Sequence, residues 1–344
     1  MLRWCESWSM SGNINDYTSY DRVLVCLNPF NCISIGRGGV FNDPFVQLSN
    51  YAGNTANFVT RVIPGGPFQA LGHSFRISMN ASPADLAVGA FDVVNNLTHC
   101  SVHFNGFNGI ISIQNASGTI FTSAPGQFPS NGMFWCEILF TIGTGTTGAV
   151  EIKLPSTSIN VTGINTQNGT RPYCDTTIWW NQNGSLSQIQ HMLWWDTTGT
   201  YNNTWMGDRR VIGELPNANG DTDQFTPIGL ASNYLNVANI PPNGADYNVN
   251  GVVGDLDLYK ISAPSGITAV AGVMVSIIST KDDAGTRSAA TQLKSNTTLV
   301  SGVSVPCASS YLSQSDVWEV DPATSAPFTP AALALVQIGA KVSA

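Results

Sequence analysis

Carboxylate side chains are the first candidates for chemistry in this 344-residue chain, because pairs of Asp and Glu residues hydrolyse glycosidic bonds. A retaining glycosidase needs two carboxyl groups about 5–5.5 Å apart, and an E-x-D-x-x-E pattern on one strand supplies such a pair. Asp255 and Asp257 in "GDLDLY" share one face of an expected strand, but an alternation of solvated residues explains them equally well. None of the five glutamates stands in the E-x-D-x-x-E pattern: they are Glu6, Glu137, Glu151, Glu214 and Glu319. The carboxylates therefore do not predict a hydrolase.

Metal ligands are the next possibility. The stretch "NANGDTD" offers side-chain oxygens at alternate positions, from Asn217, Asn219, Asp221 and Asp223. Its composition resembles a calcium loop, but the residue order of an EF-hand, with its later Glu, is absent. A capped turn is the favoured interpretation, and these four residues are weak calcium candidates only.

Histidine and nucleophile patterns give no stronger signal. "HCSVH" places His99 and His103 on one face of a strand but about 13 Å apart along it, so in that conformation they cannot share a zinc ion. The chain has no G-x-S-x-G sequence and no Cys with an obvious His partner. We therefore expect no enzyme activity, no cofactor and no resident metal.

Charged residues are scarce, at 10% of the chain against about 25% in a typical soluble domain. The net charge is −8 and the five lysines are scattered, which argues against nucleic acid as a partner. The polar surface must consist mainly of Asn, Ser, Thr, Gly and Gln. With little charge repulsion, such a surface suits the contacts of a homo-oligomer better than a free monomer.

The cysteines indicate the redox state of the thiols, and the apolar runs indicate whether the chain enters a membrane or is secreted. The seven cysteines form no C-x-x-C pair, and several lie in apolar runs such as "MFWCEILF", which predicts reduced thiols in the core. No apolar run reaches the roughly 18 residues of a membrane span. The first residues, "MLRWCESWSM", lack the apolar region and cleavage site of a signal peptide. We expect no membrane partner and assembly in a cytoplasm.

Short runs rich in Val, Ile, Phe and Thr, separated by Gly, Asn and Pro turns, dominate the first part of the chain. This spacing predicts an all-β sandwich or jelly roll. In "HSFRISM", Phe75, Ile77 and Met79 alternate with polar residues, and "NASG" is the expected turn of a hairpin. The expected strands are "DRVLVCL", "NFVTRVI", "HSFRISMN", "LAVGAFDV", "GIISIQ", "MFWCEILFTI", "AVEIKL" and "TTIWWNQ".

The pattern breaks around residue 198, after which a new set of strands begins. These are "AVAGVMVSIIST", "TTLVSGVSVP", "SDVWEVD" and "QIGAKVS". A helix is expected in "TPAALALVQ", with Thr329 as N-cap and Pro330 at the first helical position. We therefore predict a jelly roll in residues 1–198, a connector in 199–227 and a second, smaller β-sandwich in 228–344.

Aromatic and arginine residues crowd around this boundary. Trp179 with Trp180, and Trp194 with Trp195, are adjacent pairs, so in a strand one ring of each pair should point outward. Packing between the sheet and the connector is the favoured interpretation of the outward rings, and a subunit contact and stacking on a glycan are the alternatives. Four residues of the connector are the expected contact between domains or subunits, because Trp and Arg are enriched at interface centres: Trp205, Asp208, Arg209 and Arg210. The arginines are expected to pair with Asp208 or Asp196.

Several sequence features resemble one family of proteins. "WCESW" and "IQHMLWWDTTG" are similar to the first and last strands of the concanavalin-like (laminin-G-like) jelly roll of bacteriophage virion proteins, which pair with each other. "GDRRVIGELPNANGDTDQFTP" resembles the connector that follows this jelly roll in phage and prophage structural proteins. "KDDAGTR" and "WEVDPATSAPFT" resemble segments of their second β domain.

The resemblance implies a structural protein of a bacteriophage virion, most simply a tail fibre or tail appendage component whose lectin-like domain attaches to the host surface. The alternatives are a capsid decoration or neck protein and, from another class, a carbohydrate-active enzyme. The implied partners are other virion proteins, further copies of the chain (a trimer in a fibre) and a host-surface glycan. The implied location is the virion, assembled in the host cytoplasm.

Overall fold

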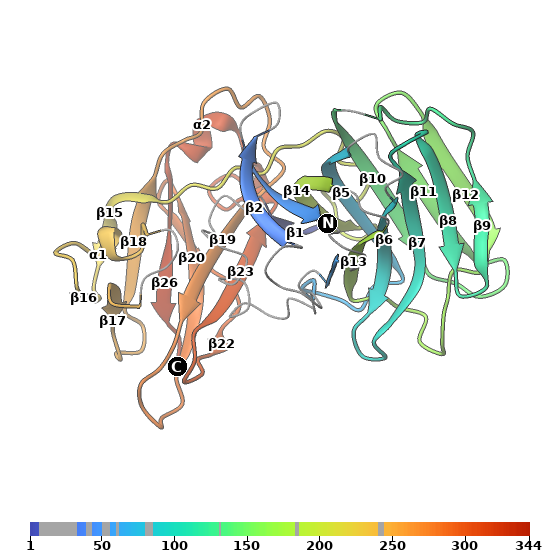
Figure 1. Ribbon diagram of the computed structural model, residues 1–344. Coiled ribbons are helices and arrows are strands. Elements are labelled where there is room, and N and C mark those ends of the chain that lie inside the picture. The colour runs from blue at the N-terminus through green and yellow to red at the C-terminus, as the bar shows by residue number, and fades with distance from the viewer. Residues whose placement is uncertain are drawn as a thin grey trace. The chain divides into compact units, whose positions relative to one another are not determined.

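The computed structural model describes residues 1–6, 33–38, 43–49, 56–59, 62–79, 85–130, 132–182, 186–239 and 244–344. Its elements are almost all β-strands, as predicted (Figure 1). The chain folds into two compact units, one ending at Val211 and the other running from Ile212 to Ala344. The expected connector is divided between them, because residues 199–211 belong to the first unit and residues 212–227 to the second. The strand "DRVLVCL" expected at residues 21–27 lies outside the described residues.

The first unit is built from two antiparallel sheets. Among the described residues, one has eight strands in the order β12-β11-β10-β5-β14-β3-β2, with β1 paired to β14, and the other has six in the order β4-β13-β6-β7-β8-β9. The eight-stranded sheet contains β1 Leu2–Glu6, β2 Ile33–Gly38, β3 Asp43–Ser49, β5 Ala70–Met79, β10 Met133–Thr141, β11 Gly148–Lys153, β12 Ser158–Ile164 and β14 Leu186–Asp196. The six-stranded sheet contains β4 Ala56–Val59, β6 Asp85–Asp92, β7 Leu97–Asn105, β8 Ile110–Asn115, β9 Gly118–Thr122 and β13 Thr176–Gln182.

Aromatic rings fill the space between the two sheets. Phe75 of β5 meets Trp179 of β13 edge to face, with 4.7 Å between the ring centroids, and meets Phe104 of β7 at 6.3 Å. All three rings are buried. Such pairs stabilise a core by about 0.5–1.5 kcal/mol each beyond the area they bury. The two sheets therefore pack face to face as a jelly-roll sandwich, and the predicted inward alternation of Phe75, Ile77 and Met79 is confirmed.

The first and last strands of the jelly roll pair as the resemblance implied. Antiparallel pairing joins β1 to β14, with Trp4 opposite Trp194 and Cys5 opposite Leu193. The register of β14 against its other neighbour, β5, shifts between Gln190 and Leu193. The predicted hairpin is also confirmed: β8 and β9 meet across the "NASG" turn, where Asn115 Oδ1 accepts the N–H of Ser117 at 2.8 Å.

The described cysteines are free thiols, and three of them are buried: Cys100, Cys136 and Cys174. Burial raises the pKa of Cys174 to about 12, and the negative charge of Asp175 adds to this effect. A thiol that stays protonated at neutral pH is a poor nucleophile. These three cysteines therefore act as small core residues, as expected, while Cys26 and Cys32 lie outside the described residues.

The second unit is a smaller β-sandwich. Its main sheet has the order β15-β18-β26-β20-β21 with β22 paired to β20, and the β19–β23 ribbon belongs to the same unit. Val275 of β19 and Leu293 of β20 share a buried cluster with Phe328, Leu333 and Val336. The strands are β15 Pro216–Asp223, β16 Thr226–Ile228, β17 Tyr247–Val249, β18 Leu256–Ile261, β19 Val273–Ser279, β20 Ser288–Ser295, β21 Thr298–Ser301, β22 Val305–Pro306, β23 Leu312–Trp318, β24 Val320–Asp321, β25 Ala326–Pro327 and β26 Val336–Val342.

Two short helices complete this unit, α1 Asn233–Asn236 and α2 Pro330–Leu333. Helix α2 begins as predicted, since Thr329 Oγ1 accepts the N–H of Ala332 at 3.1 Å and Pro330 follows it. It ends at Leu333 rather than continuing to residue 337, because Val336 already starts β26 and packs into the core. No helix of the described residues is long and apolar enough to cross a membrane.

Candidate functional site

The outer face of the six-stranded sheet carries three hydrogen-bonded polar side chains. Leu86 and Val102 point into the core, so the alternation along β6 and β7 turns Asp85, Ser101 and His103 to the outer face. Asp85 Oδ2 lies 3.0 Å from His103 Nδ1, and His103 Nε2 lies 3.0 Å from Ser101 Oγ. The imidazole is thus held on both sides by groups of the sheet itself.

Trp180 of β13 lies beside this group. It stands opposite Ala87 in the register of β13 against β6, and its ring meets His103 edge to face at 5.5 Å. A side chain at Gly89 would crowd the same ring, because its Cβ would lie 3.2 Å from Trp180 Cζ3. Trp180 is half-buried, so part of its ring reaches solvent.

A hollow of about 180 Å³ opens next to His103, at the end of the sheet where β7 turns into β8. Its lining residues include Asp85, Asn105, Asn108, Ser112 and Thr122. Asn105 Oδ1 accepts the N–H groups of the turn, and Asn108 Oδ1 accepts the N–H of Ile110 at 3.0 Å. These bonds hold both amide groups in place at the wall of the hollow.

The order Asp85–His103–Ser101 is that of an acyl-transfer triad, but its surroundings do not support catalysis. A serine nucleophile needs backbone N–H groups that can bind the developing oxyanion. Ser101 lies in the middle of β7, which pairs with β6 on one side and β8 on the other, so the ladders occupy the nearby N–H groups. The residue is also only 6% exposed. The surroundings therefore do not support covalent chemistry, and the three side chains bond to one another within the sheet.

The other three candidate tryptophans are buried. Trp194 stacks on His73 at 4.4 Å and donates to Thr177 Oγ1 at 3.1 Å, while Trp179 fills the core. Trp195 points to the outer face of the eight-stranded sheet, where Trp205 covers it at 5.6 Å. The outward ring of the 194–195 pair therefore packs between the sheet and the connector, which is the favoured interpretation, and both residues are 1% exposed. Of the four glycan-binding candidates, Trp180 alone has a ring that a ligand could reach.

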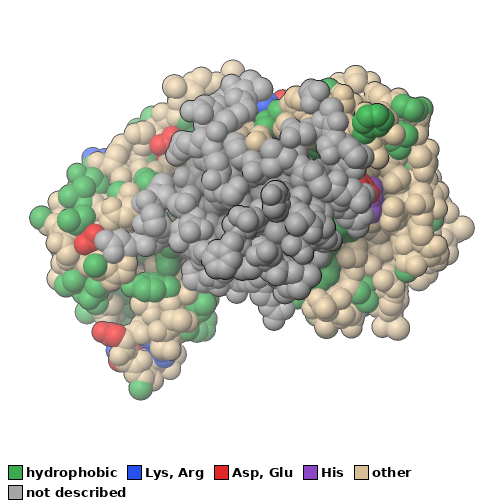
Figure 2. Space-filling model, viewed as in Figure 1, with side chains coloured by type: hydrophobic (Ala, Val, Ile, Leu, Met, Phe, Trp, Pro, Cys, Tyr) green, Lys and Arg blue, Asp and Glu red, His purple; other side chains and the backbone are tan. Residues whose placement is uncertain are grey.

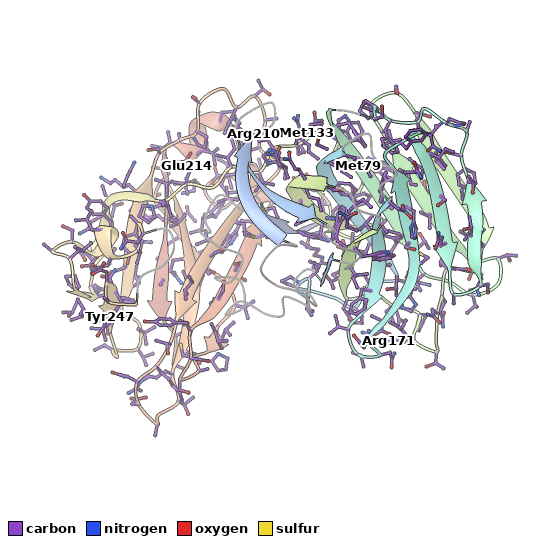
Figure 3. All side chains as sticks on the ribbon, viewed as in Figure 1. Met79, Met133, Arg171, Arg210, Glu214 and Tyr247 are labelled. Atoms are coloured by element: carbon purple, nitrogen blue, oxygen red, sulfur yellow. The ribbon has the colours of Figure 1, made fainter. Side chains whose placement is uncertain are left out.

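Two of the four expected contact residues, Trp205 and Asp208, contact strand residues of the first unit, to which this part of the connector belongs. Trp205 packs on Trp195 and under the Lys153 ammonium, which lies 4.4 Å from its ring centroid. Asp208 receives two hydrogen bonds from Arg76, at 2.8 and 2.6 Å. Arg209 donates to the carbonyl of Met206 at 2.8 Å, and Arg210 is exposed (Figure 3).

The two carboxylates expected to pair with the connector arginines have other arginine partners. Asp208 pairs with Arg76 of β5, and Asp196 pairs with Arg3 of β1 at 2.6 Å. Both partners are strand residues that the sheet brings close, whereas Arg209 bends back onto its own segment. A role for Trp205, Asp208, Arg209 and Arg210 in a contact between domains or subunits stays a prediction.

Glu137 is a residue that the motif search passed over. It lies on β10 at the centre of the outer face of the eight-stranded sheet, fully buried. Its carboxylate accepts the N–H of Met206 at 2.6 Å and that of Gly207 at 3.0 Å. Burial raises the pKa of Glu137, and these hydrogen bonds together with the charges of Lys153 and Arg209 lower it without cancelling the rise. A lone acidic residue inside the apolar run "MFWCEILF" was the available signal.

The calcium candidates lie in a strand and not in a capped turn, because residues 216–223 form β15 and pair with β18. Their side chains have separate partners. Asn217 donates to Ser262 at 2.8 Å, Asn219 donates to Asp223 at 2.5 Å, and Asp221 pairs with Lys294. Within the described part of the chain, no group of three or more His, Cys, Asp or Glu residues is placed to hold a metal ion.

Asp257 is a structural anchor and not a solvated residue, which corrects the interpretation of "GDLDLY". It is fully buried, and its Oδ1 accepts the N–H groups of Gln224 and Phe225 at 2.7 and 2.8 Å. Its Oδ2 accepts from Asn233 at 2.7 Å and from the Tyr259 hydroxyl at 2.9 Å. Four donors satisfy the carboxylate, so Asp257 holds the segment before α1 against the sheet.

Arg171 makes a comparable anchor in the jelly roll, at the opposite end of the sandwich from Met79 (Figure 3). It donates to Asp92 at 2.7 Å and to both oxygens of Asp175 at 2.6 and 2.7 Å. Asp92 is fully buried and also accepts two hydrogen bonds from Asn95. All charges in this group are paired, which marks it as structural and not as a ligand site.

His99 and His103 have separate hydrogen-bond partners in the structure. His99 Nδ1 accepts the N–H of Asn168 at 3.0 Å, and its Nε2 lies 2.8 Å from the carbonyl of Tyr173. His103 is held by Asp85 and Ser101. The two imidazole rings therefore have no hydrogen-bond partner in common.

No protein-family model matches the chain, and no curated protein matches its sequence. Solved structures are similar to about half of it. A marine alginate lyase from Aplysia kurodai is 12% identical, with a TM-score of 0.38, over 56% of this chain and 98% of the lyase. A sialidase is 11% identical, with a TM-score of 0.38, over 56% of this chain and 18% of the sialidase. Basic winged bean lectin with Tn-antigen is 9% identical, with a TM-score of 0.30, over 51% of this chain and 94% of the lectin. At these identities the similarity concerns the fold alone.

Proposed function

We propose that this chain is a non-catalytic structural protein of a bacteriophage virion whose jelly roll binds a host-surface glycan. The observation that carries the glycan-binding part is the outer face of the six-stranded sheet, where Trp180 lies beside His103 and the polar hollow. An apolar ring next to fixed hydrogen-bonding groups matches a sugar, which presents an apolar face and a rim of hydroxyls.

The virion part of the proposal rests on the resemblance of the connector and of "KDDAGTR" (281–287) and "WEVDPATSAPFT" (318–329) to phage structural proteins. The scarcity of charge supports it, because Lys, Arg, Asp and Glu make up 10% of the chain and few of them are visible among the described residues in Figure 2. Such a surface suits contacts with other virion proteins and with copies of the same chain. We place the chain in a tail fibre or tail appendage, as a homo-oligomer and in a fibre as a trimer.

Glycan binding is tested with the full chain on an array of host-surface oligosaccharides. Trp180→Ala should weaken binding by about tenfold or more, since truncating a tryptophan at the centre of a contact costs about 1.4 kcal/mol or more. Trp135→Ala is the matched control, because Trp135 is a half-buried tryptophan of the eight-stranded sheet. Equal binding by wild type and Trp180→Ala would contradict the proposed site. Release of reducing sugar by the wild type would favour the carbohydrate-active enzyme instead.

Position and assembly need separate measurements. Density for this chain on the capsid lattice of a virion reconstruction would favour a decoration protein over a fibre component, and density at the neck would favour a neck protein. Light scattering at micromolar concentration tests the oligomer, and a monodisperse monomer would contradict it.

A further inference from the structure

The hollow beside His103 has a defined set of unused hydrogen-bonding groups. Among the described residues, no acceptor bonds the side-chain nitrogens of Asn105 and Asn108, whose oxygens are engaged in the turn. The hydroxyls of Ser112 and Thr122 likewise have no partner in the described part of the chain. The wall therefore offers amide groups that donate hydrogen bonds and hydroxyls that can donate or accept them. Together these groups complement the hydroxyls of a sugar.

Asp85 is the one carboxylate among the described residues that line this wall, and no Lys or Arg is among them. His103 also lines the hollow, lies 3.0 Å from Asp85 Oδ2 and is a cation only when protonated. Asp85 Oδ1 is buried and has no described donor. A second carboxylate brought next to Asp85 would meet a like charge with no described Lys or Arg to offset it.

An exposed aromatic residue lies in the turn between two of the lining residues. Phe107 follows Asn105 and precedes Asn108, both of which line the hollow, and its N–H donates to Asn105 Oδ1 at 3.1 Å. Phe107 is 68% exposed. The hydrogen bonds to Asn105 fix the backbone that carries this ring.

We infer that this hollow takes a neutral, hydroxyl-rich sugar residue, that Asp85 excludes carboxylated sugars, and that Phe107 is the aromatic platform at its rim. The inference rests on the proposed glycan-binding function and narrows its substrate class. It also places the sugar at the β7–β8 end of the sheet, beyond Trp180.

The test measures dissociation constants of the full chain for neutral oligosaccharides and for the same oligosaccharides carrying a terminal sialic or uronic acid. Wild type should prefer the neutral member of each pair by at least about fivefold, the effect of one like-charge contact in water. Phe107→Ala should weaken binding of the neutral member by about fivefold or more. Val94→Ala is the matched control, because Val94 is an exposed apolar residue in the turn at the other end of β6 and β7, and it should leave binding unchanged.

Two charge variants sharpen the result. Asp85→Asn should narrow the gap between the neutral and the carboxylated member of a pair. Thr122→Lys, at an exposed position of the same wall, should reverse the preference without touching the Asp85–His103 contact. Binding that favours the carboxylated sugars, or that ignores Phe107→Ala and Thr122→Lys, would overturn this inference and leave the glycan-binding proposal intact. Absence of binding to any member of either set would overturn both.

Discussion

The two outer faces of the jelly roll differ in what lies on them. On the eight-stranded sheet, a covering segment of residues 205–209 packs over Trp195 and binds Glu137 through two backbone N–H groups. On the six-stranded sheet, Trp180 keeps part of its ring in solvent and polar side chains line a hollow. An outward tryptophan or carboxylate that another segment of the chain covers stabilises the fold. One that no segment covers stays available for a ligand.

Replacing a tryptophan should show the largest difference in stability between the two faces. Trp195→Ala should lower the free energy of unfolding of the first unit by about 3–5 kcal/mol, because it empties a site that is closed on both sides. Trp180→Ala should cost roughly 1–2 kcal/mol, since its ring is only partly removed from water. Urea unfolding followed by circular dichroism measures both free energies of unfolding. Equal losses would mean that the covering segment does not add to the burial of Trp195.

Removing the covered carboxylate should have the next largest effect. Glu137→Ala leaves the N–H groups of Met206 and Gly207 without an acceptor, at about 1–3 kcal/mol for each buried donor. Glu151→Ala on the neighbouring strand β11 is the control, because Glu151 is half-buried, and it should change stability by less than about 0.5 kcal/mol. Faster amide hydrogen exchange at Met206 and Gly207 in Glu137→Ala alone would locate the effect; unchanged exchange there would contradict the contact.

The burial of Glu137 should also affect how the stability of the first unit depends on pH. Burial raises the pKa of Glu137 above its usual 4.5, so the folded state holds this proton more tightly than the unfolded state does. The contribution of Glu137 is therefore fully present below the unfolded pKa and is lost as pH rises through the folded pKa. Glu137→Gln should remove this loss, which unfolding free energies measured between about pH 4 and 7 would reveal. Parallel profiles for wild type and variant would count against a raised pKa.

The smallest effect belongs to the exposed ion pair at the end of the covering segment. Asp208→Ala breaks the paired hydrogen bonds from Arg76, but Asp208 is exposed, and such pairs stabilise by about 0.2–1 kcal/mol. The melting temperature should fall slightly at low salt and differ less from wild type at high salt. A loss as large as that of Trp195→Ala would show that this pair, and not the buried ring, holds the segment.

Local sequence patterns predicted the elements well where the conformation does not depend on packing against distant segments. The alternation in "HSFRISM", the "NASG" turn and the cap at Thr329 depend on a few adjacent residues, and all three are present as expected. Helix α2 was predicted too long, since only packing of Val336 into the core decides that the chain turns into β26. The calcium stretch was misjudged for the same reason, because pairing with β18 makes it a strand.

The candidate site was predictable only in part. Trp180 was among the predicted glycan-binding residues, but Phe107 and the Asp85–His103–Ser101 group were not, because β6 and β7 bring Asp85 to His103 across 18 positions of sequence. Trp195 was predicted as an outward residue, and it does point outward from its sheet. Cover by the connector was the favoured interpretation of this ring, but the alternation alone could not decide between it, a subunit contact and an open ring.

By itself, the sequence determined the all-β class, the scarcity of charge and the alternation that selects each strand's inward residues, since these depend on composition and on a period of two residues. Only the tertiary structure decided which outward residues stay open. Glu137 and Asp257 became buried anchors because distant N–H groups reach them, whereas the wall around Asp85 stays open because no described segment closes the hollow. Burial on the outer face of a sheet is a contact between parts far apart in the chain, and no short pattern encodes it.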